Sequence, residues 1–595
     1  IHQCLKPVLE QLQEASRDAV VDGSQALNSN FKEYFHVKRP IQEELETIIQ
    51  SSSSSQSKQL ILVCGNVGDG KSHLLSLLHQ QYPEKMKGFT VHNDATESSN
   101  PKETYLDTLY KLLENFKDEN LTNDTSQKII LAINLGTLTN FLEDQKQKGS
   151  FKKLNAYVKR EKILENTEEN DSEKKELILD CFKHVNFADY HLYELTKNGA
   201  KSQVITSLFE KLTQKKAENP VWQTYKTDCT NCDLAEKCPI KFNYEFIQSE
   251  DVKRKLEDLL IKCTVQHKHL ISVRALLNFM YNLVVPLELA PLSADKLHQK
   301  IKYYQVKTFI INTLPNYLFE HPDLSSIFKY MHLLDPLSLR KEVLDQIIVQ
   351  LITTDDITNT FQEHASLPTQ ASYFYRFLQQ DFKKNERSKQ NYGLLISLFM
   401  RWHFFKGKIK GKTREEEVYQ KYLKTLYYFN KEGSEIENEL HENLYDEIEQ
   451  AVYQWNGDAF KNNMVNVFLG HQQNTYKISQ SLELDVELPS NILPKEEEKL
   501  QKFKDTFFLK YSVKGEPISV PIDFELYQLL QKVVNGYRPN KLDKSNHINF
   551  VYIVDKVIRM SSVNATLVFH ENNGKVNKGY QLSRNKFGKY KFEII

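Results

Sequence analysis

The sequence predicts an α/β core with a largely parallel sheet, then a helical region, then a C-terminal α+β region. Short apolar runs alternate with helix-period segments in the first part, leucine stripes at helical spacing dominate the middle, and period-two patterns return near the end. We therefore expect a helical lead-in over residues 1–57, the α/β domain over 58–240, a helical lid and helical domain over 241–480, and an α+β domain over 481–595.

Size and composition set the broad class. The chain has 595 residues, with 78 basic and 78 acidic side chains. Its length suggests about three to five domains, and its neutral balance means that any DNA-binding surface has to be a local patch. Seven cysteines are too few for a disulfide framework in such a chain. No apolar run reaches membrane-spanning length and the first residues lack the order of a signal peptide, so we expect a cytoplasmic protein.

The elements of the first part follow from local patterns. Residues 1–50 have helical periodicity, and the serine-rich stretch 51–57 predicts a polar loop. Densely charged residues 161–176 predict a solvated insertion. Strands of the sheet are expected at 60–64, 89–92, 128–133 and 184–187, with a helix at 106–116.

Residues 65–72 read Gly-Asn-Val-Gly-Asp-Gly-Lys-Ser and match the phosphate-binding loop G-x-x-x-x-G-K-[ST]. The strand before it and the leucines after it supply the strand–turn–helix context that the motif requires. Glycines allow successive N–H groups to face one concavity, and the following helix adds its positive dipole end. Lys71 is expected to contact the β- and γ-phosphates and Ser72 to bind Mg²⁺. The expected nucleotide-binding residues are Gly65, Asn66, Val67, Gly68, Asp69, Gly70, Lys71, Ser72 and His73.

These features predict an AAA-like P-loop NTPase core that binds ATP with Mg²⁺. A hydrolysing P-loop enzyme usually also has a carboxylate at the end of a neighbouring strand. Asp94 follows the strand at 89–92 and is our candidate for the Mg²⁺-side carboxylate, the alternative being a turn residue. The strand at 128–133 ends in Asn134, whose amide can orient a water or the γ-phosphate but cannot act as a general base.

Arg274 is the fourth candidate catalytic residue, with Lys71, Asp94 and Asn134. It starts an apolar helix after the α/β core. An arginine on such a lid helix can reach the γ-phosphate and couple nucleotide state to lid angle. The alternative is a surface salt bridge.

The later parts are predicted from periodicity. Helical stripes of core residues recur along the middle region, at Leu276, Leu277, Met280 and Leu283, at Leu344, Ile347, Ile348 and Leu351, and at Leu423 and Leu426. Strands are expected at 482–488, 507–509, 550–554 and 565–569.

Cys229, Cys232 and Cys238 form the pattern C-x2-C-x5-C. Three soft ligands so close together are typical of a structural zinc site or an iron–sulfur cluster, and zinc is our first choice. The alternative is three unligated thiols in a loop. A fourth ligand has to come from elsewhere, and the candidates are Cys181, Cys263, His267 and His269.

Two stretches are locally basic. Lysine and aromatic residues interleaved in this way suit phosphate contact plus base stacking, although a solvated surface is an equal alternative. The stretches are Lys406, Lys408, Lys410, Lys412 and Arg414, and Lys575, Lys578, Arg584, Lys586, Lys589 and Lys591 with Tyr580, Phe587, Tyr590 and Phe592.

Residues 64–75, 92–98 and 131–136 read CGNVGDGKSHLL, HNDATES and LAINLG. Together they resemble the DptF family, the P-loop subunits of Dnd-type, DNA phosphorothioation-dependent restriction modules. Residues 186–193, the cysteine pattern and residues 273–279 fit the same family, so that the resemblance covers about residues 1–290.

The resemblance implies a bacterial anti-phage defence protein. It would act with two partner subunits, G and H of the same module, on double-stranded DNA that lacks phosphorothioate, and it could form a homo-oligomer. The family's P-loop maps onto residues 65–72 without a departure. No nuclease motif is recognisable, which implies that a partner cuts the DNA.

Three functions remain open at this point. The first is an ATP-driven subunit of a DNA restriction complex. The second is a nucleotide-gated scaffold that recruits partners with little turnover, favoured by the missing water-activating carboxylate. The third is a small-molecule kinase, which the large helical region and the cysteine pattern disfavour.

Overall fold

The computed structural model divides the chain into two compact units. The first comprises residues 1–193, 201–264 and 268–410, and the second residues 194–200, 265–267 and 411–595. The division after residue 410 falls inside the helical region expected to continue to residue 480. The structure describes residues 4–17, 30–66, 69–93, 104–121, 123, 126–161, 163–164, 181–338, 341–369, 372–384, 389, 391–408, 414–430, 438–457, 459, 461, 463–467, 476–482, 484–486, 499–562, 565–571, 579–585 and 587–595.

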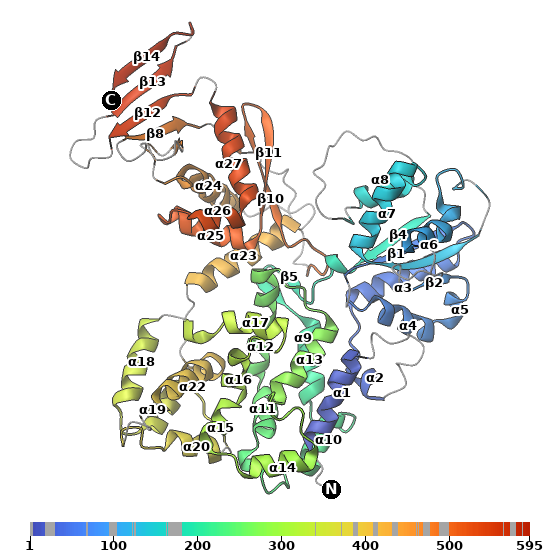
Figure 1. Ribbon diagram of the computed structural model, residues 1–595, viewed down its shortest axis with the longest axis vertical. Helices are drawn as coiled ribbons and strands as arrows, with labels where there is room; N and C mark the ends of the chain where they lie inside the picture. The colour runs from blue at the N-terminus through green and yellow to red at the C-terminus, as the bar shows by residue number, and fades with distance from the viewer. Residues whose placement is uncertain are drawn as a thin grey trace. The chain divides into compact units, whose positions relative to one another are not determined.

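A four-stranded parallel sheet lies in the first unit, in the order β2-β3-β1-β4 (Figure 1). Its two central strands are almost continuously apolar because helices cover both faces of the sheet. The expected strands at 60–64, 89–92, 128–133 and 184–187 are confirmed. The strands are β1 (Gln59–Cys64), β2 (Thr90–His92), β3 (Lys128–Ile133) and β4 (Phe182–Asn186).

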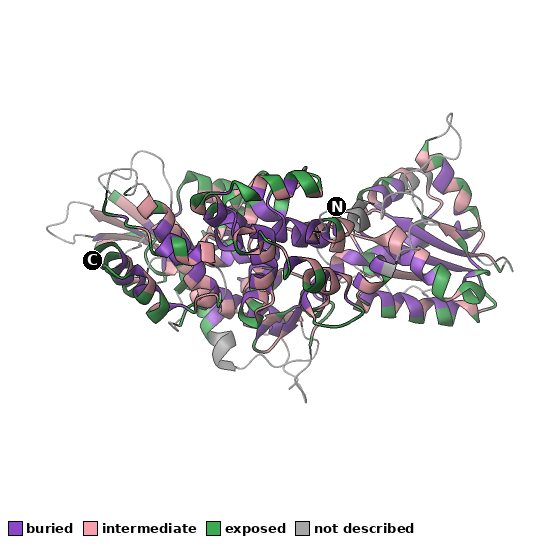
Figure 2. Cartoon of the chain, turned by 90° about the horizontal axis from the view of Figure 1, so that it is seen from below, coloured by how far each residue is buried: buried purple, intermediate pink, exposed green. Residues whose placement is uncertain are grey.

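Two helical layers sandwich this sheet. One layer packs leucines and isoleucines against Ile61, Val63 and Ile130, and the other packs against Leu60, Leu62 and Leu131. Figure 2 shows the sheet as buried between them. The first layer holds α3 (Pro40–Ser53), α4 (Lys71–Gln81) and α5 (Pro83–Met86), and the second holds α6 (Tyr105–Leu112), η1 (Glu114–Phe116), α7 (Leu135–Lys148) and α8 (Lys152–Arg160).

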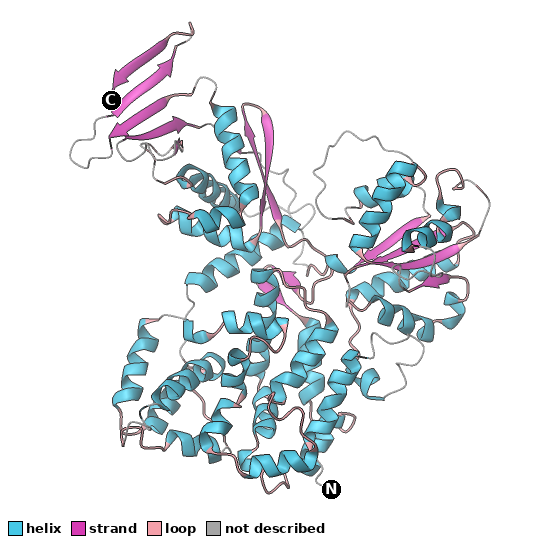
Figure 3. Ribbon diagram, in the orientation of Figure 1, coloured by secondary structure: helices cyan, strands magenta, loops and turns pink. Residues whose placement is uncertain are grey.

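The rest of the first unit is helical (Figure 3). Its helix α1 (Leu5–Arg17) precedes the sheet in sequence but packs against α13 and α10. The other elements are α2 (Asn30–Phe35), η2 (Phe187–Asp189), α9 (Gln203–Thr213), α10 (Pro220–Thr224), η3 (Tyr225–Cys229), η4 (Ala235–Lys237), α11 (Pro239–Ile247), α12 (Glu250–His267), α13 (Val273–Val284), α14 (Ala294–Lys302), α15 (Val306–Ile311), α16 (Leu314–Glu320), α17 (Ser326–Leu333), η5 (Pro336–Ser338), α18 (Glu342–Thr353), α19 (Ile357–His364), α20 (Ser372–Leu378) and α22 (Asn391–Lys406).

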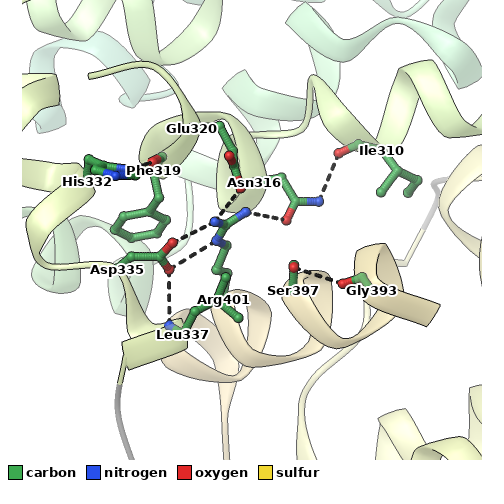
Figure 4. A network of polar contacts seen from close by, with 10 residues as sticks. All are labelled: Ile310, Asn316, Phe319, Glu320, His332, Asp335, Leu337, Gly393, Ser397 and Arg401. Carbon is green, nitrogen blue, oxygen red and sulfur yellow. Dashed lines mark hydrogen bonds and ion pairs between the residues drawn. The ribbon is translucent and has the colours of Figure 1, made fainter. Parts of the chain in front are cut away.

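A buried arginine of α22 ties this helix to α16 and to the turn before η5 (Figure 4). Arg401 of α22 has only 2% of its side chain exposed, and its Nη2 lies 2.6 Å from Asp335 Oδ2 and 2.5 Å from Glu320 Oε1. Its Nη1 donates to Asn316 Oδ1 at 3.2 Å. The guanidinium therefore satisfies most of its donors inside the protein, as a buried charge requires.

The second unit contains both helices and antiparallel sheets, and it includes residues before 481, where the expected α+β domain begins. A three-stranded antiparallel sheet, β11-β10-β9, and a five-stranded one, β14-β13-β12-β8-β7, accompany its helices. The two-stranded sheet β5–β6 also belongs mainly to this unit, although it follows soon after β4 in the sequence. The elements are β5 (Glu194–Thr196), β6 (Gly199–Lys201), α23 (Arg414–Asn430), α24 (Asn438–Gln454), β7 (Met464–Asn466), β8 (Tyr476–Ser481), β9 (Asp485–Val486), β10 (Phe507–Val513), β11 (Glu516–Ile522), α25 (Phe524–Val534), α26 (Lys541–Asn546), α27 (Ile548–Ser561), β12 (Leu567–Glu571), β13 (Gly579–Arg584) and β14 (Tyr590–Ile594).

Three local expectations are corrected. Residues 550–554 lie inside α27 and do not form a strand, because Phe550, Val554 and Val557 are buried at helical spacing while Tyr552 is exposed. Residues 51–53 extend α3 into the serine stretch. Strands β7 and β8 occur before residue 481, where only helices were expected. Most of the charged stretch 161–176 lies outside the described residues.

Within the described part of the chain, no helix combines the length and apolar character needed to cross a bilayer.

Candidate functional site at the carboxyl edge of the parallel sheet

The glycine-rich loop joins the end of a central strand to the start of a helix. β1 ends at Cys64 and α4 begins at Lys71. Gly70 is the N-cap of α4 with φ 93°, a left-handed conformation that favours glycine. The first N–H groups of α4 therefore face the same end of the sheet as the carboxyl ends of the strands. Val67 and Gly68 lie outside the described residues.

Lys71 is folded back over this loop. Its ammonium donates to the carbonyl oxygens of Gly65 at 3.0 Å and Asn66 at 2.7 Å. The two carbonyls hold a positive charge directly above the loop. A phosphate group has more negative charge than these carbonyls and would compete for the same donors.

Asp69 closes the loop from within. Its Oδ2 accepts a hydrogen bond from the Asn66 N–H at 2.6 Å. Burial raises the pKa of this carboxyl, while the Asn66 N–H and the charges of Lys71 and Arg39 act in the opposite direction. A Cβ on Gly65 would lie 2.8 Å from Phe187 Cβ and 2.9 Å from Asp69 Oδ2, so this position has room only for glycine.

Arg39 is a member of the site that the sequence did not reveal. It is the N-cap of α3, its Nη2 donates to the Asp69 carbonyl at 3.4 Å, and its guanidinium lies 5.0 Å from the centroid of the Phe187 ring. Burial lowers the pKa of Arg39 to about 10 and the charge of Asp69 opposes this, so the guanidinium stays charged at neutral pH. The only sequence signal is a basic residue before Pro40, which starts the helix.

Asn134 lies beside the loop, as the register of the sheet requires. Cys64 of β1 pairs with Ile133 of β3, so that Gly65 and Asn134 leave neighbouring strands at the same level. The Asn134 Oδ1 accepts a hydrogen bond from the Thr137 N–H at 2.7 Å and thereby caps α7. Its Nδ2 donor has no partner among the described residues. The side chain can therefore offer a donor to a ligand but no proton acceptor.

The remaining nucleotide-site predictions have mixed outcomes. Ser72 and His73 are in the first turn of α4, and the rings of His73 and His36 are 6.0 Å apart. Asp94 lies outside the described residues. Arg274 is in the first turn of α13, a helix that packs against α1, α11, α16 and α17. The structure gives Arg274 no hydrogen bond or ion pair within the described part of the chain.

The three clustered cysteines lie at the ends of short helical elements. Cys229 ends η3, Cys238 caps α11, and Cys232 lies in the turn between them. All three are free thiols. Cys232 Sγ, Asp233 Oδ1 and His298 Nε2 lie within 4.8 Å of one another, and the last two atoms are 2.9 Å apart.

A fourth cysteine accompanies them, and it is none of the four expected candidates. Cys4 immediately precedes α1, which packs against both η3 and α11. Cys181 is instead in the core of the parallel sheet, and Cys263 is fully buried along α12. The His269 ring packs against Tyr330, with ring centroids 5.0 Å apart, and His267 is the last residue of α12. Sequence spacing could not suggest Cys4 because the whole sheet domain separates it from the other three.

The basic stretches are only partly described, and some of their cations have internal partners. Lys410, Lys412, Lys575, Lys578 and Lys586 lie outside the described residues. Lys406 donates to Ser249 Oγ, and Lys408 donates to the Gln362 carbonyl at 2.5 Å. Arg584 lies 5.8 Å from the centroid of the Tyr590 ring.

No protein-family model matches this chain, and no curated protein matches it. The functional argument therefore rests on the residues and their geometry.

Proposed function

We propose that the loop at residues 65–72 binds ATP with Mg²⁺ and that the chain is the ATPase subunit of a phosphorothioation-dependent DNA restriction complex. The observation that carries the nucleotide proposal is the position of Lys71. Its ammonium is held over a glycine-rich loop that joins a central parallel strand to a helix N-terminus. This combination of cation, loop N–H groups and helix dipole is suited to a triphosphate.

The sheet topology supports the same location. β1 and β3 are neighbours at the centre of the sheet. The chain leaves β1 toward the edge strand β2, and it leaves β3 toward β4 at the opposite edge. In open α/β sheets, ligands bind outside the carboxyl ends of adjacent strands whose connections part in this way. Here that place lies between Gly65 and Asn134.

Each side chain has a separate role in this proposal. Lys71 binds the β- and γ-phosphates, and Ser72 binds Mg²⁺. Asp94 is the Mg²⁺-side carboxylate, and Asn134 donates its amide hydrogen to the γ-phosphate or the attacking water. Arg39 is a fixed positive charge that orients the loop through the Asp69 carbonyl. Arg274, as the lid arginine, would have to approach the γ-phosphate in the nucleotide-bound state.

The proposed partners are subunits G and H of the same module and double-stranded DNA without phosphorothioate. The resemblance of residues 1–290 to the DptF family supports this part. A second support is the C-terminal sheet, where Tyr590 and Phe592 of β14 are exposed and Arg584 of β13 is paired with Tyr590. Aromatic side chains next to cations are suited to nucleic-acid contact.

A second function is favoured by Asn134. Its acceptor oxygen is engaged in capping α7, so this position cannot take a proton from water. A nucleotide-gated scaffold needs ATP binding but no water-activating base. In that case ATP would set the geometry of the helical lid and recruit the partner subunits with little turnover.

Steady-state ATP hydrolysis by the purified chain tests the proposal, measured alone, with plain duplex and with phosphorothioated duplex. We expect turnover that rises with plain DNA and is lost in Lys71→Ala. Lys87→Ala is the matched control, because this exposed lysine is paired with Glu84 on the surface, away from the glycine-rich loop. ATP binding without turnover under any condition would favour the scaffold, and absence of ATP binding would overturn both functions.

A further inference from the structure

Three chain segments meet where the cysteines lie. Cys4 precedes the first residue of α1, Cys229 is the last residue of η3, and Cys238 is the residue before α11. Helix α1 packs against both η3 and α11. The fold therefore brings the start of the chain to the C-x2-C-x5-C segment through helix packing that does not involve the cysteines themselves.

The thiols are close enough to act on one another electrostatically. Burial raises the pKa of the Cys229 thiol, and Cys238, Cys4 and Cys232 raise it further. Burial, with smaller contributions from Cys4 and Cys232, raises the pKa of Cys238 to about 12. The four thiols are therefore gathered around one place in the fold, and soft sulfur ligands gathered in this way suit a thiophilic metal.

Backbone donors already point at these sulfur atoms. The backbone N–H of Leu5 lies close enough to Cys229 to lower the pKa of its thiol, and the N–H groups of Lys6 and Lys241 do the same for Cys4 and Cys238. Hydrogen bonds of this kind favour the thiolate over the thiol. They arise because Cys4 and Cys238 each stand at a helix N-terminus, where the first N–H groups have no partner within the helix.

We propose that Cys4, Cys229, Cys232 and Cys238 together bind one thiophilic metal centre, either a zinc ion or an iron–sulfur cluster. Four thiolates form a closed coordination shell for both, so the role is structural. Binding releases the thiol protons to solvent and places positive charge among the sulfurs. The centre fastens α1 to η3 and α11 and so joins the start of the chain to the helical region.

The side chains must adjust to close this shell. Within the described part of the chain, no three of the four sulfur atoms lie within 4.8 Å of one another. His298 is the competing ligand, because its Nε2 is within 4.8 Å of Cys232 Sγ. The His298 Nε2 atom is already paired with Asp233 Oδ1 at 2.9 Å. This pairing favours a role for His298 next to the metal ligands and not as one of them.

The test is the metal content of the full-length chain, purified without oxygen and analysed for zinc, iron and acid-labile sulfide. We expect either about one zinc per chain, or about four iron and four sulfide atoms per chain. The variants Cys4→Ser and Cys238→Ser should each contain at most half of the metal found in the wild-type chain. Cys263→Ala and His298→Ala should retain it, because neither residue belongs to the proposed shell.

Metal-free wild-type protein, even after supply of zinc or of iron with sulfide, would overturn the proposal, as would full metal content in Cys4→Ser. If that variant does not fold, alkylation of the wild-type chain gives a second measurement. Cys4 should be protected together with the other three thiols until a chelator removes the metal, and independent labelling of Cys4 would contradict the assignment. These measurements do not use ATP, so they stand apart from the test of the proposed function.

Discussion

At the scale of single residues, Asn134 combines two roles that can be separated. Its oxygen caps α7, and the residue follows β3 at the same edge of the sheet as the glycine-rich loop, where its amide can serve as a donor. Serine is also a good N-cap residue, but its short hydroxyl cannot replace the amide donor. Alanine removes both functions.

We predict that Asn134→Ser and Asn134→Ala both lower ATP turnover by about 10- to 100-fold, because each removes the donor to the developing charge. Only Asn134→Ala should also lower the free energy of unfolding, by about 1 kcal/mol, through loss of the cap. Turnover at saturating ATP and urea unfolding measure the two effects. Normal turnover in Asn134→Ser would limit this residue to its capping role.

Arg401 is the second residue whose role can be measured directly. Arg401→Met should lower the free energy of unfolding by about 3–5 kcal/mol, because Asp335 would remain buried without its partner. The double variant with Asp335→Leu should recover part of this loss. Urea unfolding of both variants tests the pair, and an equal loss in single and double variants would show that the pairing is not the cause.

At the scale of elements, a helix or strand could be predicted from the sequence where its local pattern agrees with its burial in the folded protein. β1 and β3 could be predicted because the central strands of a covered parallel sheet are apolar on both faces. The β-branched run at 550–554 misled the prediction, since burial of Phe550, Val554 and Val557 against neighbouring elements selects a helix instead. Arg39 and Cys4 could not be predicted because packing of α3 and α1, and no local spacing, brings them to their sites.

Helix α22 gives the chain a pH dependence that can be tested. Burial, together with smaller effects of His364, Lys341 and Lys255, lowers the pKa of His403 from an ordinary value near 6.5 to about 4. The unfolded chain therefore binds a proton at a higher pH than the folded one. The stability that depends on an uncharged His403 is therefore fully present above about pH 6.5 and is lost as the pH falls toward 4.

We predict that His403→Gln reduces the loss of stability between pH 6.5 and about 4. The variant cannot take up the proton that favours the unfolded wild-type chain in this window. Urea unfolding at several pH values measures the effect, and His547→Gln is a control because that histidine lies in the second unit. Identical pH dependence in wild type and His403→Gln would contradict the prediction.

At the scale of the whole molecule, the chain comprises two compact units with separate cores. The proposed nucleotide site belongs entirely to the first unit. A ligand that binds only the folded form of one unit stabilises that unit by about 2.7 kcal/mol at 100 times its dissociation constant.

We predict two calorimetric unfolding transitions, of which Mg²⁺ with a non-hydrolysable ATP analogue raises only one. Lys71→Ala should abolish the shift and leave both transitions in place. Limited proteolysis at intermediate temperature can then assign each transition to a unit. A single transition that moves as a whole with nucleotide would show that the two units unfold together.

The second unit is discontinuous in sequence, since it includes residues 194–200 as well as residues 411–595. Leu195 forms a bridge with Leu500, and its strand β5 packs against α23. During synthesis the β5–β6 hairpin leaves the ribosome more than 200 residues ahead of its strand partner. At about 5–20 residues per second it waits at least about ten seconds for that partner. Residues 411–595 thus complete the second unit around a hairpin that was synthesised well before them.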